Sequence, residues 1–183
     1  MSGPVVVALA GLPGAGKTTL ASEIVRRTGW SYISRDEVRA SMFQPCHYTD
    51  LEKHAAFGAV LLAVEATAQL GRSCIVEGMP FSRVGELESV GEATRAAGAV
   101  FVPFLVHVPA AVAAQRIQRH NASMGQRIAD RVPDLAYEVA ARMRTFEAGI
   151  HCLDGTGSTE ELADTVLRAV ESRRMAANDL MER

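Results

Sequence analysis

An octapeptide close to the N-terminus restricts this chain to a small set of folds. Residues 11–18 read Gly-Leu-Pro-Gly-Ala-Gly-Lys-Thr and complete the G-x-x-x-x-G-K-[ST] spacing of a phosphate-binding loop. They follow the apolar run Val-Val-Val-Ala-Leu-Ala, so the loop joins an expected buried strand to an expected helix, as the motif requires. Glycines let backbone N–H groups close around a phosphate, and the helix N-terminus adds the positive end of its dipole.

The side chains of this loop predict a nucleotide bound with magnesium. In such loops the lysine, here Lys17, reaches the β- and γ-phosphates, and the hydroxyl of Thr18 is a Mg²⁺ ligand. Lys17 and Lys53 are the only lysines in the sequence, so there is no Asn-Lys-x-Asp motif to read guanine, which favours ATP. The residues expected to hold ATP are Gly11, Gly14, Ala15, Gly16, Lys17, Thr18 and Thr19.

The rest of the chain alternates short apolar runs with longer helical patterns, which is typical of a parallel α/β sheet. The expected strands are residues 5–10, 31–34, 73–77, 100–108 and 150–153. The expected helices cover 17 to about 28, start at 36, at 49, at 109 (toward 120) and at 158, and cover 134–146. The helix after Thr49 is apolar nearly all round and is expected to be buried. We predict one α/β domain over 1–183, with a five-stranded parallel sheet and helices on both faces.

Composition excludes several classes of protein. Of the 183 residues, 48% are hydrophobic and 22% are charged, as in folded globular proteins. The net charge of −2 provides no general attraction to nucleic acid or to an anionic membrane. The longest uncharged apolar stretch, residues 55–64, is too short to span a membrane, and the three cysteines are odd in number and widely spaced. We therefore expect a cytoplasmic protein with reduced thiols, whose oligomeric state the sequence does not specify.

A second polar group follows the second expected strand, where residues 34–39 read Ser-Arg-Asp-Glu-Val-Arg. In a parallel sheet this position lies at the same carboxyl edge as the phosphate-binding loop, where ligands bind. Asp36 and Arg39 are three residues apart and share a helical face, so both can address one acceptor. Asp36 can accept a hydroxyl proton there. The alternative is that it only begins the helix and pairs with Arg39.

Glu77 ends the third expected strand at the same edge of the sheet. An acidic residue at this place commonly holds Mg²⁺, directly or through water, so Glu77 and Thr18 are the expected metal ligands and Glu77 also belongs to the substrate side. The alternative is a glutamate that faces solvent.

Residues 121–133 are polar and interrupt two helical patterns, which predicts a mobile lid over about 116–145. Arg116 and Arg119 share a helical face and Arg127 follows within the lid, so these cations can converge on a transferring phosphoryl group. We expect Arg116 and Arg119 to be catalytic and Arg127 to bind substrate. The alternative is a solvated basic face.

Together these motifs resemble the small P-loop kinases related to phage polynucleotide 5′-hydroxyl kinase, chloramphenicol phosphotransferase and the zeta toxins. The resemblance covers most of the chain and rests on residues 11–18, on the Arg-Asp-Glu-x-Arg sequence at 35–39 and on the arginine-bearing stretch after Val108. It implies a P-loop NTPase fold with a helical lid, Asp36 as the general base and Arg39 as an acceptor-binding residue. One lid arginine of the polynucleotide kinases falls on His120 here.

Two further segments carry resemblances of their own. Residues 78–83 are similar to the strand-end segment of nucleoside monophosphate kinases, which implies that Arg83 grips the acceptor. Gly155 and Thr156 follow the last expected strand, where kinases of this kind cradle adenine through backbone contacts.

The sequence thus predicts an ATP-dependent kinase that phosphorylates a hydroxyl group. A sugar, a nucleoside, an antibiotic and the 5′ end of a polynucleotide remain as acceptors, and a nucleic acid is less favoured because aromatic residues make up only 5% of the chain. Two alternatives stay open: a nucleoside monophosphate-type kinase with a phosphate acceptor, and a non-catalytic ATP-binding switch. No metal other than Mg²⁺ is expected.

Overall fold

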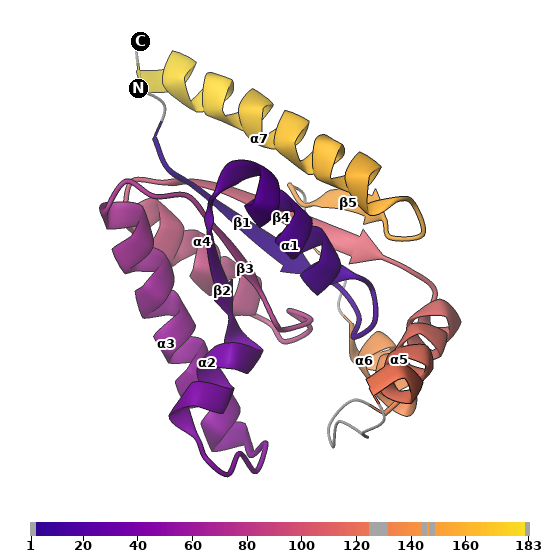
Figure 1. Cartoon of the computed structure of the whole chain (residues 1–183). Helices are drawn as coiled ribbons and strands as arrows, with labels where there is room; N and C mark the ends of the chain where they lie inside the picture. The colour runs from indigo at the N-terminus through magenta and orange to yellow at the C-terminus, as the bar shows by residue number, and fades with distance from the viewer. Residues whose placement is uncertain (1–2, 125–131, 144–145, 147–148, 182–183) are drawn as a thin grey trace.

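The computed structural model describes residues 3–124, 132–143, 146 and 149–181, and there it forms one five-stranded sheet (Figure 1). Neighbouring strands are parallel, in the order β2-β3-β1-β4-β5. The strands are β1 (Val5–Ala10), β2 (Ser31–Ser34), β3 (Cys74–Glu77), β4 (Val100–His107) and β5 (His151–Asp154). The predicted α/β fold is confirmed, and each predicted strand end lies within one residue of the observed end.

Helices cover both faces of this sheet, as predicted. They are α1 (Lys17–Thr28), α2 (Arg35–Met42), α3 (Asp50–Gln69), α4 (Glu86–Ala96), α5 (Ala110–Met124), α6 (Asp134–Arg142) and α7 (Thr159–Met181). α1 and α7 lie on one face, α3 and α4 lie on the other, and α5 packs against α6 at one end of the sheet (Figure 1). Among the described residues, no helix has the length and apolar character that crossing a membrane would take.

β1 is buried along its whole length because the sheet is covered on both faces. Val5, Val7 and Leu9 belong to the core shared with α1 and α7, whereas Val6 and Ala8 belong to the core shared with α3 and α4. β1 lies between β3 and β4, so the chain leaves its carboxyl end at the point where the strand order reverses. In open parallel sheets this point is where ligands bind.

The expectation that α3 is buried holds for one side of the helix only. Its buried positions recur every four residues on one side only: Glu52, Ala56, Val60, Val64 and Ala68. The opposite side exposes large apolar residues, among them Leu51 and Leu62. The apolar composition of this helix therefore does not mean that all its sides are buried, because a helix that covers one face of a sheet can bury only one side. The predicted start of this helix is confirmed, and Thr49 and Glu52 bond reciprocally there as a capping box.

The helices around the predicted lid differ from expectation in their ends. α5 continues to Met124 rather than ending near His120, and α6 ends at Arg142 rather than at 146. The first residues of the segment expected to be a polar lid are therefore helical, and residues 125–131 lie outside the described residues.

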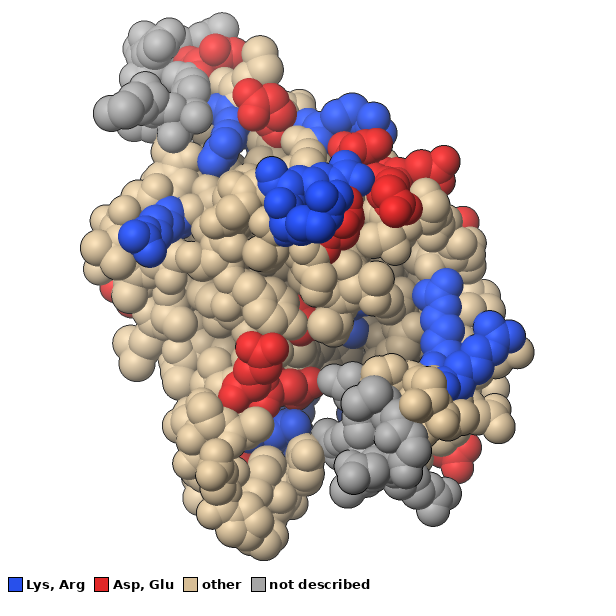
Figure 2. Space-filling view, viewed as in Figure 1, with Lys and Arg blue, Asp and Glu red and all other residues tan. Residues whose placement is uncertain are grey.

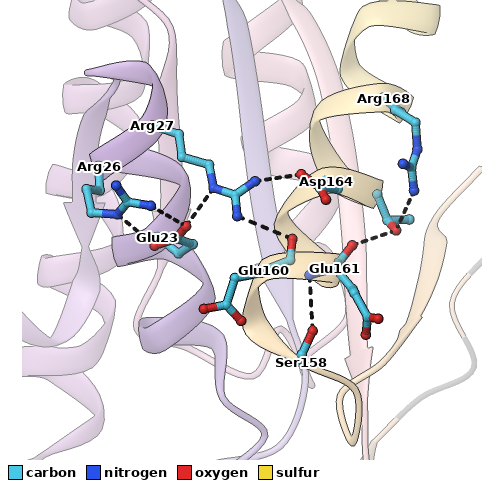
Figure 3. Close-up of polar contacts among 9 residues, drawn as sticks. Glu23, Arg26, Arg27, Ser158, Glu160, Glu161, Asp164 and Arg168 are labelled. Atoms are coloured by element: carbon cyan, nitrogen blue, oxygen red, sulfur yellow. Dashed lines mark hydrogen bonds and ion pairs between the residues drawn. The ribbon is translucent and has the colours of Figure 1, made fainter.

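An ion-pair network joins α1 to α7 (Figure 3). Arg27 donates to Oε1 of Glu23 on its own helix and to Oδ1 of Asp164 on α7, both at 2.6 Å. Arg26 also bonds Glu23, and hydrogen bonds from Arg26 and Arg27 lower the pKa of the Glu23 carboxyl from 4.5 to about 2. The network ties the helix that follows the glycine-rich loop to the C-terminal helix.

Candidate active site

The glycine-rich loop between β1 and α1 has a backbone that only glycine accommodates at two positions. Gly11 has φ 137° and Gly14 has φ 81°, and an added Cβ at either residue would lie 2.4 Å from a backbone oxygen, of Val106 and Ala113 respectively. Lys17 is buried, and its Nζ donates to the carbonyls of Gly11 at 2.8 Å and Leu12 at 2.9 Å. The loop thus forms a closed cradle with the lysine held across it.

Thr18, in the first turn of α1, is joined to the end of β3. Its hydroxyl donates to Oε2 of Glu77 at 3.1 Å, and the hydroxyl of Tyr32, on β2, donates to Oε1 of the same carboxylate. Glu77 is only 3% exposed, so it does not face solvent, contrary to the alternative raised by the sequence. Burial, followed by the contact with Glu77, raises the pKa of the Tyr32 phenol, which stays a neutral donor.

The N-terminus of α2 presents Asp36 between two guanidinium groups. Oδ1 of Asp36 lies 3.3 Å from Nη2 of Arg39 and 3.8 Å from Nη2 of Arg35, and the carboxylate side chain is 32% exposed. Arg39 is buried and its guanidinium stacks over the ring of Tyr48, 4.4 Å from the centroid. Asp36 thus does pair with Arg39, as the alternative interpretation expects. The pair does not prevent Asp36 from lining the cavity described below.

Gly78 brings α2 close to the end of β3. Its φ is +84°, and an added Cβ would lie 2.8 Å from the backbone nitrogen of Arg35 and 2.9 Å from that of Asp36. Any side chain at position 78 would therefore displace the start of α2. The start of α2, with Asp36, is therefore packed directly against the end of β3.

A cavity of about 780 Å³ joins these parts. It is lined by residues 13–14 and 16–19 of the loop, by Asp36 and Arg39, by residues following β3 and by side chains of α5 and α6. Figure 2 shows a hollow between the α2 and α3 end of the molecule and the α5 and α6 end, with charged side chains around it. Three carboxylates (Asp36, Asp50, Glu86) face seven basic groups: Lys17, Arg35, Arg39, Lys53, Arg83, Arg116 and Arg142. The cavity is cationic although the whole chain carries a net charge of −2.

Arg116 connects the glycine-rich loop to the segment that follows β5. It donates to the carbonyl of Ala15 in the loop at 3.2 Å and to the carbonyl of Gly155, after β5, at 2.9 Å. Gly155 packs too closely on Val106 and Val108 for a side chain, since an added Cβ would meet either at 2.8 Å. The structure therefore brings Arg116 and Gly155 to the loop, in keeping with a site that spans β1 and β5.

Other predicted residues do not meet in the cavity. Arg119 is exposed and does not line it, Arg127 lies outside the described residues, and Thr156 bonds Asp154 at the surface without lining it. Gly11, Ala15, Glu77 and Gly155 are buried and do not line the cavity.

Sequence reasoning missed several residues around this site, among them Asp50 and Glu86 on the cavity wall and four more. Tyr32 holds Glu77, Tyr48 stacks on Arg39, and Lys53 and Arg142 line the cavity. In the sequence, Lys53 was notable only as one of two lysines, and Tyr32, Tyr48 and Arg142 belong to no motif. Tertiary packing alone brings them together.

The oxygen atoms around Thr18 are suitable ligands for Mg²⁺. A threonine hydroxyl and a carboxylate, 3.1 Å apart, are the hard oxygen ligands that this ion prefers. In the part of the chain that the structure describes, no group of three or more His, Cys, Asp or Glu side chains is placed to hold a metal by itself. Two protein oxygens agree with an ion that takes its other ligands from nucleotide phosphates and water.

Comparisons with known proteins agree with this geometry. Residues 6–145 match the family described as AAA domain. A putative kinase from Chloroflexus aurantiacus superimposes with a TM-score of 0.73 at 19% identity, covering 94% of this chain and 98% of that one. A gluconokinase from Sinorhizobium meliloti gives 0.67 at 15% identity, covering 100% and 99%. The APS kinase CysC of Mycobacterium tuberculosis, in complex with AMPPNP and APS, gives 0.68 at 16% identity, covering 93% and 99%.

No curated protein sequence matches the chain. The structural neighbours have low identity, so they establish the fold alone, and that fold is of the P-loop kinase type, as the sequence resemblance predicted. The family match, in contrast, extends over most of the 183 residues. The chain therefore belongs to the AAA domain family.

Proposed function

We propose that this protein is an ATP-dependent phosphotransferase that moves the γ-phosphoryl group to a hydroxyl group, with Asp36 as the general base. The observation that carries the proposal is that Lys17, Thr18 and Asp36, which come from two different strand ends, line the same cavity. Nucleotide binding alone would need only the glycine-rich loop. A carboxylate on the opposite wall is what a hydroxyl acceptor needs in addition.

The residues divide into a donor half and an acceptor half. Backbone N–H groups of the loop and Lys17 hold the phosphates of ATP. Thr18 and Glu77 would hold Mg²⁺, which neutralises charge on the phosphate oxygens when it is bound. Asp36 orients the acceptor hydroxyl and takes its proton, while Arg39, 3.3 Å away, keeps the carboxylate in place.

The finer assignments follow from this division. Arg116 stabilises the loop from the adenine side, and Gly155 and Thr156 border the base. Arg119 remains our candidate for a catalytic cation and Arg127 for a substrate-binding one, in a lid over about 116–145 of a single 1–183 domain. We place the reaction in the cytoplasm, supported by the three free thiols Cys46, Cys74 and Cys152.

A second candidate function has one observation in its favour. Arg39 and Arg83 line the cavity together, as a clamp on a phosphate acceptor would require. A nucleoside monophosphate-type kinase needs such a clamp but has little need of a base, because its acceptor is already ionised. Replacing Asp36 by Asn therefore separates the two functions.

The test is ADP release by the purified protein with ATP and Mg²⁺ over a panel of acceptors. The panel holds nucleosides, nucleoside monophosphates, sugars, sugar acids, aminoglycosides, chloramphenicol and 5′-hydroxyl oligonucleotides, and Lys17→Ala is the blank. We expect one class of hydroxyl acceptor to stimulate ADP release in the wild type only. Tight ATP binding without stimulation by any acceptor would contradict the proposal and favour a nucleotide-binding switch.

A further inference from the structure

A smaller cavity of about 250 Å³ adjoins the acceptor side of the active-site cavity. It lies between the start of α2, the N-terminal part of α3 and the N-terminus of α4. Arg35, Lys53, Arg83 and Glu86 line both cavities. The two spaces are therefore adjacent and share four residues of their walls, so the second one lies within reach of a molecule that occupies the first.

The charges that line this side cavity favour an anion. Three of its lining residues are permanent cations, Arg35, Lys53 and Arg83, and Glu86 is the single carboxylate among them. The carboxylate of Glu86 already accepts a hydrogen bond from the backbone N–H of Arg83. The N-terminus of the eleven-residue helix α4, capped by Gly85 without a side-chain cap, adds the positive end of a dipole to the same wall, which Glu86 and Glu88 in the first turn partly offset.

The positive charge of Arg35 is only partly balanced by neighbouring groups. Its side chain is 13% exposed, and its Nε is buried without a hydrogen-bond partner among the described residues. The nearest carboxylate oxygen, of Asp36, is 3.8 Å away and is shared with Arg39. Burial lowers the pKa of this guanidinium, as expected where charge is incompletely solvated. An anion from a ligand would offset that cost.

Lys53 and Arg83 are held in a way that an incoming anion can replace. Both pair with Oδ1 of Asp50, at 3.6 and 3.0 Å. The Asp50 side chain is 80% exposed, and ion pairs at such positions contribute little to stability because water and salt screen them. Asp50 does not line the side cavity, so its ion pairs with the two cations leave that cavity unfilled.

We propose that the acceptor is a hydroxy compound with an anionic group at its non-reacting end, and that this group binds in the side cavity against Arg35, Lys53 and Arg83. The inference rests on the proposed function, since it treats the active-site cavity as the acceptor site. A carboxylate, a sulfate and a phosphate share the required chemistry. Neutral sugars and neutral antibiotics are poor acceptors on this account.

The kinetic test compares acceptors that differ by one anionic group. Glycerol with glycerate and glucose with gluconate test a carboxylate, and adenosine with adenosine 3′-monophosphate tests a phosphate. We expect the anionic member of at least one pair to have the higher kcat/KM by tenfold or more. The double variant Lys53→Gln/Arg83→Gln removes that preference mainly through KM, and Arg168→Gln, on α7, is the matched control. Equal kcat/KM for neutral and anionic members overturns the inference and leaves the proposed function intact.

A binding test does not depend on turnover. With the glycine-rich loop saturated by MgAMPPNP, sulfate is titrated into the wild type and the variants and thermal unfolding is followed. We expect sulfate to raise the unfolding temperature of the wild type and of Arg168→Gln. In the double variant we expect most of this rise to be lost. The same sulfate response in the double variant, or none in the wild type, contradicts the proposed subsite. Sulfate binding without turnover of any acceptor contradicts the proposed function, and the inferred acceptor with it.

Discussion

The hydroxyl of Thr18 donates a hydrogen bond of 3.1 Å to Oε2 of Glu77, which lies 59 residues further along the chain. This contact connects the first turn of α1 to the carboxyl end of β3. The two lie close together because α1 follows β1, and β1 is the neighbour of β3 in the sheet. Tyr32, on β2, donates to the other oxygen of the carboxylate. Two earlier parts of the chain, α1 and β2, therefore hold the carboxylate of Glu77 at the candidate magnesium site.

Tyr32→Phe tests whether the tyrosine positions Glu77. Losing a partly buried hydrogen bond to a carboxylate is expected to lower the free energy of unfolding by about 1–2 kcal/mol and to raise the Mg²⁺ concentration for half-maximal ADP release several-fold. Urea unfolding and a Mg²⁺ titration measure the two effects. Tyr137→Phe, at an exposed position of α6, is the control. Loss of stability with an unchanged Mg²⁺ requirement would show that Tyr32 is only a packing residue.

Gly78→Ala tests the close approach that places Asp36. The new Cβ would lie under 3.0 Å from two backbone nitrogens of α2, so that helix must shift. We expect a loss of about 1–3 kcal/mol of stability and a larger loss of kcat than of ATP affinity. Gly98→Ala is a matched control, because Gly98 also has a positive φ but an added Cβ meets nothing within 4 Å. Equal effects of the two substitutions on kcat would refute the positioning role.

Arg116→Gln tests the contact between the loop and the segment after β5. The substitution removes hydrogen bonds to two backbone carbonyls, of Ala15 and Gly155, which hold opposite sides of the expected nucleotide site. We expect the KM for ATP to rise about tenfold, with a smaller change in kcat. A large fall in kcat at unchanged KM would instead mean that the guanidinium leaves these carbonyls and acts on the transferring phosphoryl group.

Glu23→Gln tests the network between α1 and α7 through its pH dependence. The folded-state pKa of Glu23, about 2, lies below its ordinary value of 4.5, so its stabilising contribution is present above pH 4.5 and is lost as the pH falls toward 2. The variant should therefore be less stable than the wild type at pH 7, and the difference should shrink below pH 4.5. Urea unfolding between pH 7 and pH 3 measures it, with Glu92→Gln as a surface control. A difference that is independent of pH contradicts the network.

The sequence predicted those parts of the molecule that local chemistry determines. Residues 11–18 specified the loop, the strand before it and the helix after it, and the apolar runs located the sheet, because buried parallel strands are nearly continuous in apolar residues. The motif at 35–39 likewise placed Asp36 at the cavity, since it follows a strand whose carboxyl end faces the loop.

Contacts between residues far apart in the chain could not be predicted from the sequence motifs. Lys53 reaches the cavity because α3 packs against α2, and Tyr48 lies over Arg39 through the loop between those helices. Arg116 and Arg119 look equivalent by helical spacing, yet only Arg116 lines the cavity, because the helix presents the two side chains at different angles to the loop. Such distinctions depend on how helices pack, which spacing along one helix does not determine.

Phosphoryl transfer to a hydroxyl with Asp36 as the base is tested most directly by single-turnover rates for wild type and Asp36→Asn with the best acceptor, alongside their affinities for MgATP. The account predicts a transfer rate lower by about 10²–10⁴-fold in the variant, with ATP affinity unchanged within a factor of two or three. A transfer rate within a few-fold of the wild type would contradict the assignment of Asp36 and favour a phosphate acceptor.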